Sequence, residues 1–325
     1  MVAKWVGIRV NEFAIGFGPK LFSFQKGETK YSLRLLPIGG FCSMEGEDET
    51  SSDERAYCNQ SVWKRLLVCL AGAFNNIMLG FLLVTLLLTL SGRFGTTTVA
   101  RFEEQATSCQ GDGLQLEDKI LEINGRKIFC VSDISYMLMN APADSVSMTV
   151  ERDGEKVELN SVKFKTEEIQ GHNYISIDFK VYGEDVSFRN IFLVIKEAAL
   201  ETVSIARLVW MTLLDLLRGR YGLNEIMGPV GTISTVGQAA KANLSSLVYI
   251  MAMITVNLGV FNLLPIPALD GGRCLILLIS GIIRKEIPAK YEAIIHGIGM
   301  ILLLLFMAIV AGNDILRLIR GRMLL

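Results

Sequence analysis

Three long stretches without a charged side chain constrain what this chain can fold into more than any other feature. They cover residues 66–92, about 242–269 and 293–313. A helix of roughly 20 apolar residues crosses the hydrocarbon core of a bilayer, so each stretch is long enough to span a membrane. The chain is 51% apolar and has a positive mean hydropathy, yet 20% of its residues are charged. This combination predicts a multi-pass α-helical membrane protein with an inserted water-exposed domain, and therefore a lipid bilayer as one partner.

Charge balance and cysteine spacing argue against two other classes of protein. The formal net charge is −1, which gives no electrostatic reason to expect a nucleic-acid partner. The six cysteines are scattered without a CxxC pair, so we expect free thiols rather than disulfides or a short-range metal site.

The first ten residues, MVAKWVGIRV, lack the regions of a signal peptide.

Basic residues beside the apolar stretches predict the topology. Lys64 and Arg65 directly precede the first stretch, and Arg273, Arg284, Lys285 and Lys290 lie between the second and the third. The positive-inside rule places both of these regions in the cytoplasm and residues 94–165 on the opposite side. The basic tail RLIRGR would then lie outside, against the rule, although late charges carry less weight than early ones.

We expect residues 1–62 to form a β-hairpin region. Apolar residues alternate between Val10 and Phe41, and Lys26-Gly27-Glu28 is typical of a turn. Because the hairpin is apolar and precedes a membrane span, we expect it to be associated with the membrane. Two shorter apolar stretches, 274–283 and 191–217, are ambiguous. The second contains five charged residues, which favours amphipathic, interfacial helices over residues 190–241.

The inserted domain, residues 94–165, shows two strand and turn patterns. GLQLEDKILEINGRKI, from Gly113 to Ile128, predicts a strand followed by a turn at Asn124-Gly125, and SVSMTVERDGEKVEL predicts a hairpin turning at Asp153-Gly154. The first pattern resembles the signature of PDZ domains in bacterial proteases, with Glu117 in place of a glycine. We therefore expect a PDZ-like α+β domain, followed by a β-rich connector at residues 166–189.

The stretch NLLPIPALDGGR ends the second apolar run within a C-terminal transmembrane core, residues 242–325. An aspartate at membrane depth costs a few kcal/mol, so Asp270 calls for a partner such as a metal, a proton or a cation. Pro265 and Pro267 break the helix before it, and Gly271-Gly272 allow close approach of a neighbouring backbone. On local grounds it is equally acceptable that Asp270 only caps a cytoplasmic helix.

This stretch is similar to the Asn-x-x-Pro-x-Pro-x-Leu-Asp-Gly-Gly signature of the site-2 protease family, bacterial intramembrane zinc metalloproteases. VNEFAIGFGPKLFS, LLPIGGF, NQSVWKRLLVCLAGAFNN, GPVG and IHGIG follow the order seen in its anti-sigma-factor-cleaving subgroup. The resemblance implies a bacterial inner-membrane protein with a Zn²⁺ cofactor and Asp270 as a zinc ligand. It also implies that Asn262, with Pro265 and Pro267, handles the substrate.

The family's other two zinc ligands and its general base come from a His-Glu-x-x-His helix, and no such motif occurs in these 325 residues. We expect the sequence to be an N-terminally truncated version of a complete protease, with the motif ending just before Met1. A homologue that has lost this helix, or zinc ligands of another kind, are the alternatives. His296 is a better replacement ligand than His172, which we expect in a solvated loop, but His296 and Asp270 together still leave a tetrahedral site short of a ligand.

The resemblance predicts hydrolysis of transmembrane segments of membrane proteins. The hairpin would pair with the unwound substrate, and the PDZ-like domain would select substrates by a peptide tail or by size. A polypeptide of these 325 residues is expected to be inactive, because it lacks His-Glu-x-x-His. The rival function is a membrane-anchored PDZ adaptor without catalysis, for which Asp270 would be dispensable. A transporter is disfavoured, since the spans are few and no internal repeat is visible.

Overall fold

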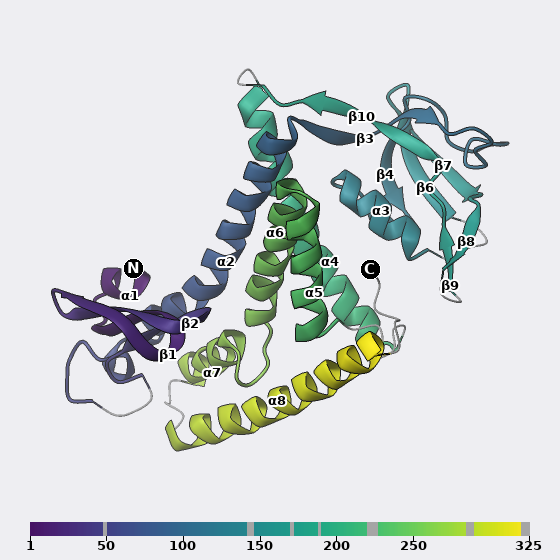
Figure 1. Cartoon of the computed structure of the whole chain (residues 1–325). Coiled ribbons are helices and arrows are strands. Elements are labelled where there is room, and N and C mark those ends of the chain that lie inside the picture. Colours follow the sequence, from purple (N-terminus) through teal and green to yellow (C-terminus); the bar gives the residue numbers. More distant parts are fainter. Residues whose placement is uncertain are drawn as a thin grey trace. The chain divides into compact units, whose positions relative to one another are not determined.

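The computed structural model describes residues 1–47, 51–141, 146–169, 172–187, 190–219, 227–283 and 289–319 (Figure 1). The chain forms two compact units. The first contains Met1–Asn76, Ile226–Gly231 and Leu258–Leu324, and the second contains Ile77–Glu225 and Thr232–Asn257. The candidate site lies in the first unit, and the large β-sheet lies in the second.

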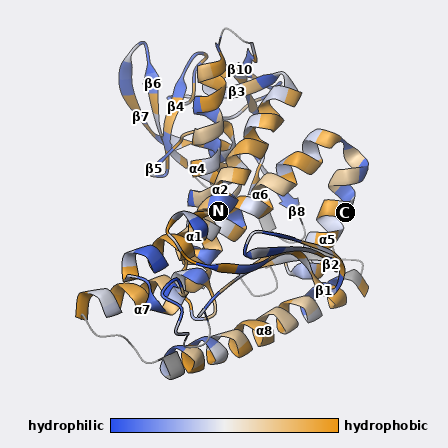
Figure 2. Ribbon diagram, turned by 90° about the vertical axis from the view of Figure 1, so that its left-hand side faces the viewer, coloured by the Kyte–Doolittle hydropathy of each residue, from blue (hydrophilic) through white to orange (hydrophobic). Residues whose placement is uncertain are grey.

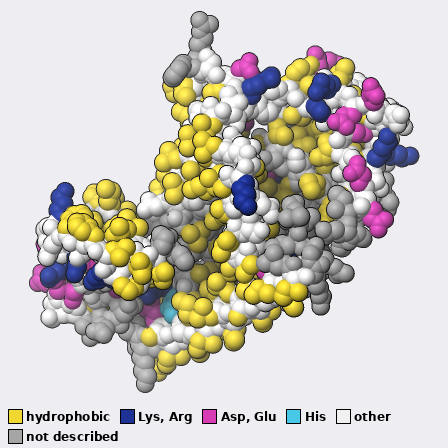
Figure 3. All heavy atoms as spheres, in the orientation of Figure 1, with side chains coloured by type: hydrophobic (Ala, Val, Ile, Leu, Met, Phe, Trp, Pro, Cys, Tyr) yellow, Lys and Arg dark blue, Asp and Glu magenta, His cyan; other side chains and the backbone are white. Residues whose placement is uncertain are grey.

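Three helices in the described part of the chain are long and apolar enough to cross a membrane. They are α2 (Val62–Ser91), α6 (Leu244–Asn262) and α8 (Ala289–Ile319). Figure 2 shows the hydrophobic colouring of these helices, and Figure 3 shows hydrophobic side chains gathered over α8. Exposed apolar side chains along a long helix are what a lipid environment requires. The three uncharged stretches of the sequence therefore form helices, and the protein is a membrane protein.

The first unit begins with α1 (Val2–Trp5) and the predicted hairpin, formed by β1 (Val10–Lys26) and β2 (Thr29–Met44). The strands are antiparallel, and Lys26 pairs with Thr29. Gly27 has a φ of +63° between them, which glycine adopts without strain. The turn predicted at Lys26-Gly27-Glu28 is therefore confirmed.

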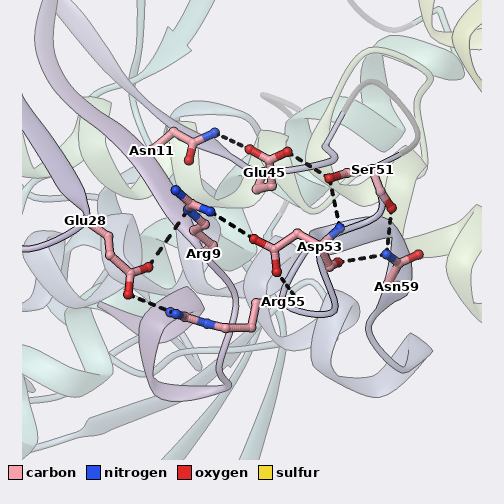
Figure 4. Close-up of polar contacts among 8 residues, drawn as sticks. All are labelled: Arg9, Asn11, Glu28, Glu45, Ser51, Asp53, Arg55 and Asn59. Atoms are coloured by element: carbon pink, nitrogen blue, oxygen red, sulfur yellow. Dashed lines mark hydrogen bonds and ion pairs between the residues drawn. The ribbon is translucent and has the colours of Figure 1, made fainter.

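Polar contacts join both the base and the turn of this hairpin to the loop that leads to the 3₁₀ helix η1 (Tyr57–Asn59). The Arg9 guanidinium lies 3.0 Å from the Asp53 carboxylate, and Arg55 lies 2.9 Å from Glu28 (Figure 4). Two backbone bonds of 3.0 Å join the same parts, from Arg9 N–H to Arg55 O and from Glu45 N–H to Arg9 O. The ion pairs are exposed and contribute little stability, so the backbone bonds and the geometry of the network fix the path of the loop.

The second unit contains a six-stranded sheet in the order β10-β3-β4-β6-β7, with β5 paired to β4. Its strands are β3 (Arg93–Phe102), β4 (Lys119–Ile123), β5 (Arg126–Lys127), β6 (Val146–Arg152), β7 (Glu155–Val162) and β10 (Phe179–Asp185). Helix α3 (Val131–Met139) packs on the sheet, and its Ile134 and Leu138 belong to the same buried core as Val99, Ile120 and Val150. We call this region the sheet domain.

Both turns predicted in the sheet domain are present. Asn124 and Gly125 have φ values of +48° and +71°, and Asp153 and Gly154 have φ values of +51° and +83°, as two-residue hairpin turns require. Glu117 has a φ of +70°. A glycine would take this conformation without strain, which explains why the resembled signature has glycine at this position.

One prediction for this unit is wrong. His172 is the first residue of β9 (His172–Ile175), which pairs with β8 (Thr166–Ile169), rather than a loop residue. The polar sequence of the segment suggested a loop, but pairing with a neighbouring strand satisfies its backbone. The side chain of His172 lies outside the described part of the chain.

Two further helices follow the sheet domain: α4 (Ile191–Leu217) and α5 (Pro229–Ala242). α4 contacts α3 through side-chain hydrogen bonds, from Ser132 Oγ to Glu201 Oε1 at 2.5 Å and between the Tyr136 and Thr212 hydroxyls at 2.8 Å. The sheet domain is thus attached to α4 by polar contacts.

Candidate metal centre

The candidate site is built on the segment between α6, which ends at Asn262, and α7 (Asp270–Ile283). Four residues of this segment form a tight turn, closed by a 3.1 Å hydrogen bond from Leu269 N–H to Ile266 O. Pro267 occupies its second position, and Ala268, with a φ of +79°, occupies the third. Proline followed by a positive φ is the signature of a type II turn. The prolines therefore end the membrane helix and turn the chain directly into α7.

The two glycines after Asp270 bring α7 into direct contact with this turn segment. A β-carbon added at Gly271 would lie 2.3 Å from Leu264 O, and one at Gly272 would lie 2.4 Å from Ile266 O. Neither distance is tolerated by a side chain, so only glycine fits at both positions. The close backbone approach predicted for Gly271-Gly272 is confirmed, and it fixes where Asp270 starts the helix.

Asp270 is the first residue of α7, where the helix dipole favours a carboxylate. Burial raises the pKa of its carboxyl, and the nearby Arg273 opposes this shift. Gly72 of α2 faces it, since a β-carbon there would lie 3.2 Å from Asp270 Oδ2. Arg273 itself lies 2.9 Å from Glu47. The site thus presents a partly buried carboxylate beside an apolar helix.

The other predicted site residues lie on the same segment. Asn262 is the last residue of α6 and is partly buried, Pro265 is exposed, and Pro267 is partly buried within the turn. The structure therefore brings the four residues Asn262, Pro265, Pro267 and Asp270 together on one short stretch.

His296, on α8, contacts the turn through a backbone hydrogen bond. The Ala268 N–H donates to His296 Nδ1 at 2.9 Å. Nδ1 must be unprotonated to accept this bond, so a neutral imidazole carries its proton on Nε2. A metal needs a free lone pair, and in this arrangement neither nitrogen offers one. His296 is therefore not a zinc ligand here.

Two thiols lie near Asp270 without completing a metal site. The Cys69 thiol lies 3.2 Å from the Tyr57 hydroxyl, and contact with Cys69 together with burial raises the pKa of Cys274. Among the described residues these thiols and Asp270 do not form a group of three ligands that could hold a metal ion. All six cysteines are free, as predicted.

The described residues around Asp270 supply fewer ligands than a zinc site needs. Across the described ranges, no three His, Cys, Asp or Glu side chains form a group that could hold a metal ion. A zinc site usually has at least three protein ligands, and among the described residues no such set surrounds Asp270. The described residues therefore do not complete a zinc centre.

Taken together, these features define a class of protein. Helix α6, which is long and apolar enough to cross a membrane, leads into the Ile266–Leu269 turn, and the partly buried carboxylate of Asp270 follows directly. This is the arrangement that the sequence resemblance predicts for a membrane-embedded metallopeptidase.

Comparison with known proteins identifies the family. Residues 1–306 match the model of peptidase family M50, and the chain belongs to this family, the site-2 proteases. A relative from Clostridium perfringens, named a zinc metalloprotease, is 39% identical over 317 residues, which cover 97% of this chain and 92% of the relative. A zinc metalloprotease by name from Fusobacterium nucleatum is 32% identical, with 98% and 93% covered. The regulator of sigma-W protease RasP of Bacillus subtilis is 28% identical, with 98% and 94% covered.

Proposed function

We propose that this chain carries the substrate-handling and Asp270-bearing parts of an intramembrane zinc metalloprotease in a bacterial inner membrane. Its reaction is the hydrolysis of peptide bonds within transmembrane segments of other membrane proteins. The observation that carries this proposal is the turn at Ile266–Leu269, which follows the membrane-length helix α6 and places Asp270 at the start of α7. The name of the Bacillus subtilis relative, a regulator of sigma-W protease, favours anti-sigma factors as the substrate class.

Asp270 has the role of a zinc ligand in this proposal, and Asn262, Pro265 and Pro267 contact the substrate strand. Asp270 would be one of the residues that hold the zinc ion, and the ion would supply Lewis-acid chemistry at a peptide carbonyl. The chain's own contribution is to hold the carboxylate still. Its first helical turn is backed by the carbonyls of Leu264 and Ile266, so the carboxylate needs little reorganisation when the metal binds.

The hairpin supports recognition of an unwound substrate. In the described part of the chain, β1 and β2 pair only with each other, and residues 12–15 pair on both sides, with 40–43 and with 30–33. The open edges therefore lie along the other halves of the two strands, residues 20–26 of β1 and 40–44 of β2. Among the hairpin side chains that the structure describes, nine large apolar ones are exposed: Phe13, Ile15, Phe17, Leu21, Phe22, Phe24, Leu33, Leu35 and Leu36. Such a surface suits lipid and an apolar peptide, and strand addition gives affinity with little sequence demand.

The sheet domain acts in this proposal as an extracytoplasmic PDZ-like module that filters substrates by their tails or size. Its support is the antiparallel sheet with the single helix α3 and the edge strand β10, together with the left-handed conformation at Glu117.

Proteolysis by reconstituted protein tests the proposal. A chain extended at its N-terminus by a helix with His-Glu-x-x-His should cleave a model transmembrane substrate in a chelator-sensitive manner. Asp270→Asn should lower that rate by about 100-fold or more, as loss of a metal ligand does. Asp112→Asn, an exposed carboxylate outside the site, is the matched control and should not change it.

The 325-residue polypeptide alone should be inactive, because it contains no His-Glu-x-x-His. Chelator-sensitive cleavage by this polypeptide would show that other ligands complete the site. If the extended chain does not cleave but the sheet domain binds C-terminal peptides, and Asp270→Ala leaves that binding unchanged, the adaptor function replaces the protease.

A further inference from the structure

We propose that His296 is a positioning residue, which holds the Pro267–Ala268 turn in the conformation that orients Asp270. The inference rests on the proposed function, since the orientation of Asp270 matters for catalysis only in a metalloprotease. It assigns to His296 a hydrogen bond with the backbone N–H of Ala268, whereas an imidazole close to an aspartate would first be considered a metal ligand.

The turn contains a residue that does not favour it. Ala268 has a φ of +79°, a region that glycine and asparagine populate but that is strained for alanine. The third position of a type II turn requires such a φ. The turn's own hydrogen bond, from Leu269 N–H to Ile266 O, leaves the Ala268 N–H without a partner inside the turn. An acceptor outside the turn is therefore needed to favour this conformation over one with negative φ.

His296 supplies that acceptor. Its Nδ1 lies 2.9 Å from the Ala268 nitrogen, across 28 residues of sequence. Gly299, three residues further along α8, lies on the same face of the helix and touches the turn as well. A β-carbon added at Gly299 would lie 2.5 Å from Pro267 Cβ and 2.7 Å from the Pro267 carbonyl oxygen. The close approach at Gly299 therefore brings α8 near enough for the imidazole to reach the turn.

The second ring nitrogen supports a role for Nδ1 rather than simple packing. Nε2 is buried, and it has no hydrogen-bond partner in the described ranges. An unpaired buried donor is unfavourable, and an apolar side chain at this position would avoid it. Histidine is nevertheless present, and its satisfied contact is the one with Ala268. Gly297, between the two contact residues, has no neighbouring atom within 4 Å of an added β-carbon and takes no part.

Hydrogen–deuterium exchange of the full chain, followed by mass spectrometry, tests the proposal without requiring proteolysis. His296→Gln removes the acceptor near Ala268, and exchange of the amides in residues 266–272 should become about tenfold faster. His296→Asn should restore slow exchange, because asparagine Oδ1 is bonded to Cγ as Nδ1 is in histidine. Gly297→Ala is the control on the same helix and should leave this exchange unchanged.

A second substitution separates positioning from general packing. Ala268→Gly removes the strain at a φ of +79°. In a protein that already carries Ala268→Gly, the increase in amide exchange caused by His296→Gln should therefore be at least about threefold smaller. In an extended chain that cleaves, His296→Gln should lower kcat and His296→Asn should retain most of it.

Two results would overturn the proposal: His296→Gln exchanging at the wild-type rate, or His296→Asn exchanging as fast as His296→Gln. Unchanged exchange in strand β6 checks that each variant is folded. Failure of the Asp270 cleavage test would instead contradict the proposed function and leave the exchange result intact.

Discussion

Substitution of Arg207 by leucine should detach α4 from the sheet domain. The Asp133 side chain is fully buried in α3, and its Oδ1 lies 2.8 Å from Arg207 Nη2. Asp133 also accepts hydrogen bonds from the Ser204 hydroxyl and, at 2.7 Å, from the Phe129 N–H. Arg207 Nη1 donates to Lys127 O at 2.7 Å. Arg207 therefore joins α4 to the sheet domain by an ion pair and a backbone hydrogen bond.

The expected loss of stability depends on the contacts that Asp133 keeps after the substitution. Removal of one partner from a buried ion pair costs about 3–5 kcal/mol, because a charge is left buried without its counter-ion. Two donors stay on Asp133, and the Arg207 side chain is 24% exposed, so the lower end of this range applies. We expect a loss of about 3 kcal/mol in the free energy of local opening, which corresponds to roughly 100-fold faster amide exchange in α3.

Exchange of residues 131–139 in Arg207→Leu measures this directly. The matched control is Arg93→Leu, since Arg93 lies 2.8 Å from Asp185 but both side chains are largely exposed. An exposed pair contributes less than about 1 kcal/mol, so the control should change exchange by less than about fivefold. Adding Asp133→Asn to Arg207→Leu should recover part of the loss, because the uncompensated charge is then gone. Equal exchange in Arg207→Leu and Arg93→Leu would show that the buried ion pair does not hold α4 to the sheet domain.

Three further outcomes are expected. Asp314→Ala should open the start of α5, at a cost of about 1–2 kcal/mol by amide exchange, because Asp314 accepts hydrogen bonds from Gly228 N–H (3.2 Å) and Gly231 N–H (2.8 Å). Glu117→Gly should raise the stability of the sheet domain in a urea titration by about 1 kcal/mol, since the φ of +70° is strained for glutamate. The Ser32 hydroxyl, with Arg34 and Lys20, lowers the pKa of Glu12 to about 2 from an ordinary 4.5. Its stabilisation of the hairpin is therefore present above pH 4.5 and lost as the pH falls toward 2, and circular dichroism of Glu12→Gln should lack this acid-dependent step.

Local rules account for what the sequence predicted well. Membrane helices follow from length and the absence of charge, and the turns at Gly27, Asn124-Gly125 and Asp153-Gly154 follow from residues that accept positive φ. The close approach at Gly271-Gly272 was predictable for the same reason, since adjacent glycines beside prolines indicate backbone contact. Each of these inferences uses residues that are near one another in sequence.

The contacts of His296 and Asp133 could not be predicted in this way. Asp133 meets Ser204 across 71 residues, and His296 meets a backbone amide across 28. A backbone N–H has no sequence signature, so a histidine near an aspartate motif is naturally considered a metal ligand first. His296 and Gly299 of IHGIG are three residues apart, so they lie on the same face of a helix, and the glycine allows another backbone to come close to that face. This spacing was the one feature of the sequence that indicated a backbone contact of α8.

The position of Asp270 is set by backbone packing from two sides. Gly271 and Gly272 of α7 approach the segment before them, and Gly299 of α8 approaches Pro267. A β-carbon added at each glycine would lie 2.3–2.7 Å from a backbone atom of that segment. Backbone contacts of this kind cannot relax as side chains do, so they fix the position at which Asp270 begins α7. It follows that Gly299→Ala, which leaves Asp270 itself intact, should impair cleavage by an extended chain more than Gly297→Ala does.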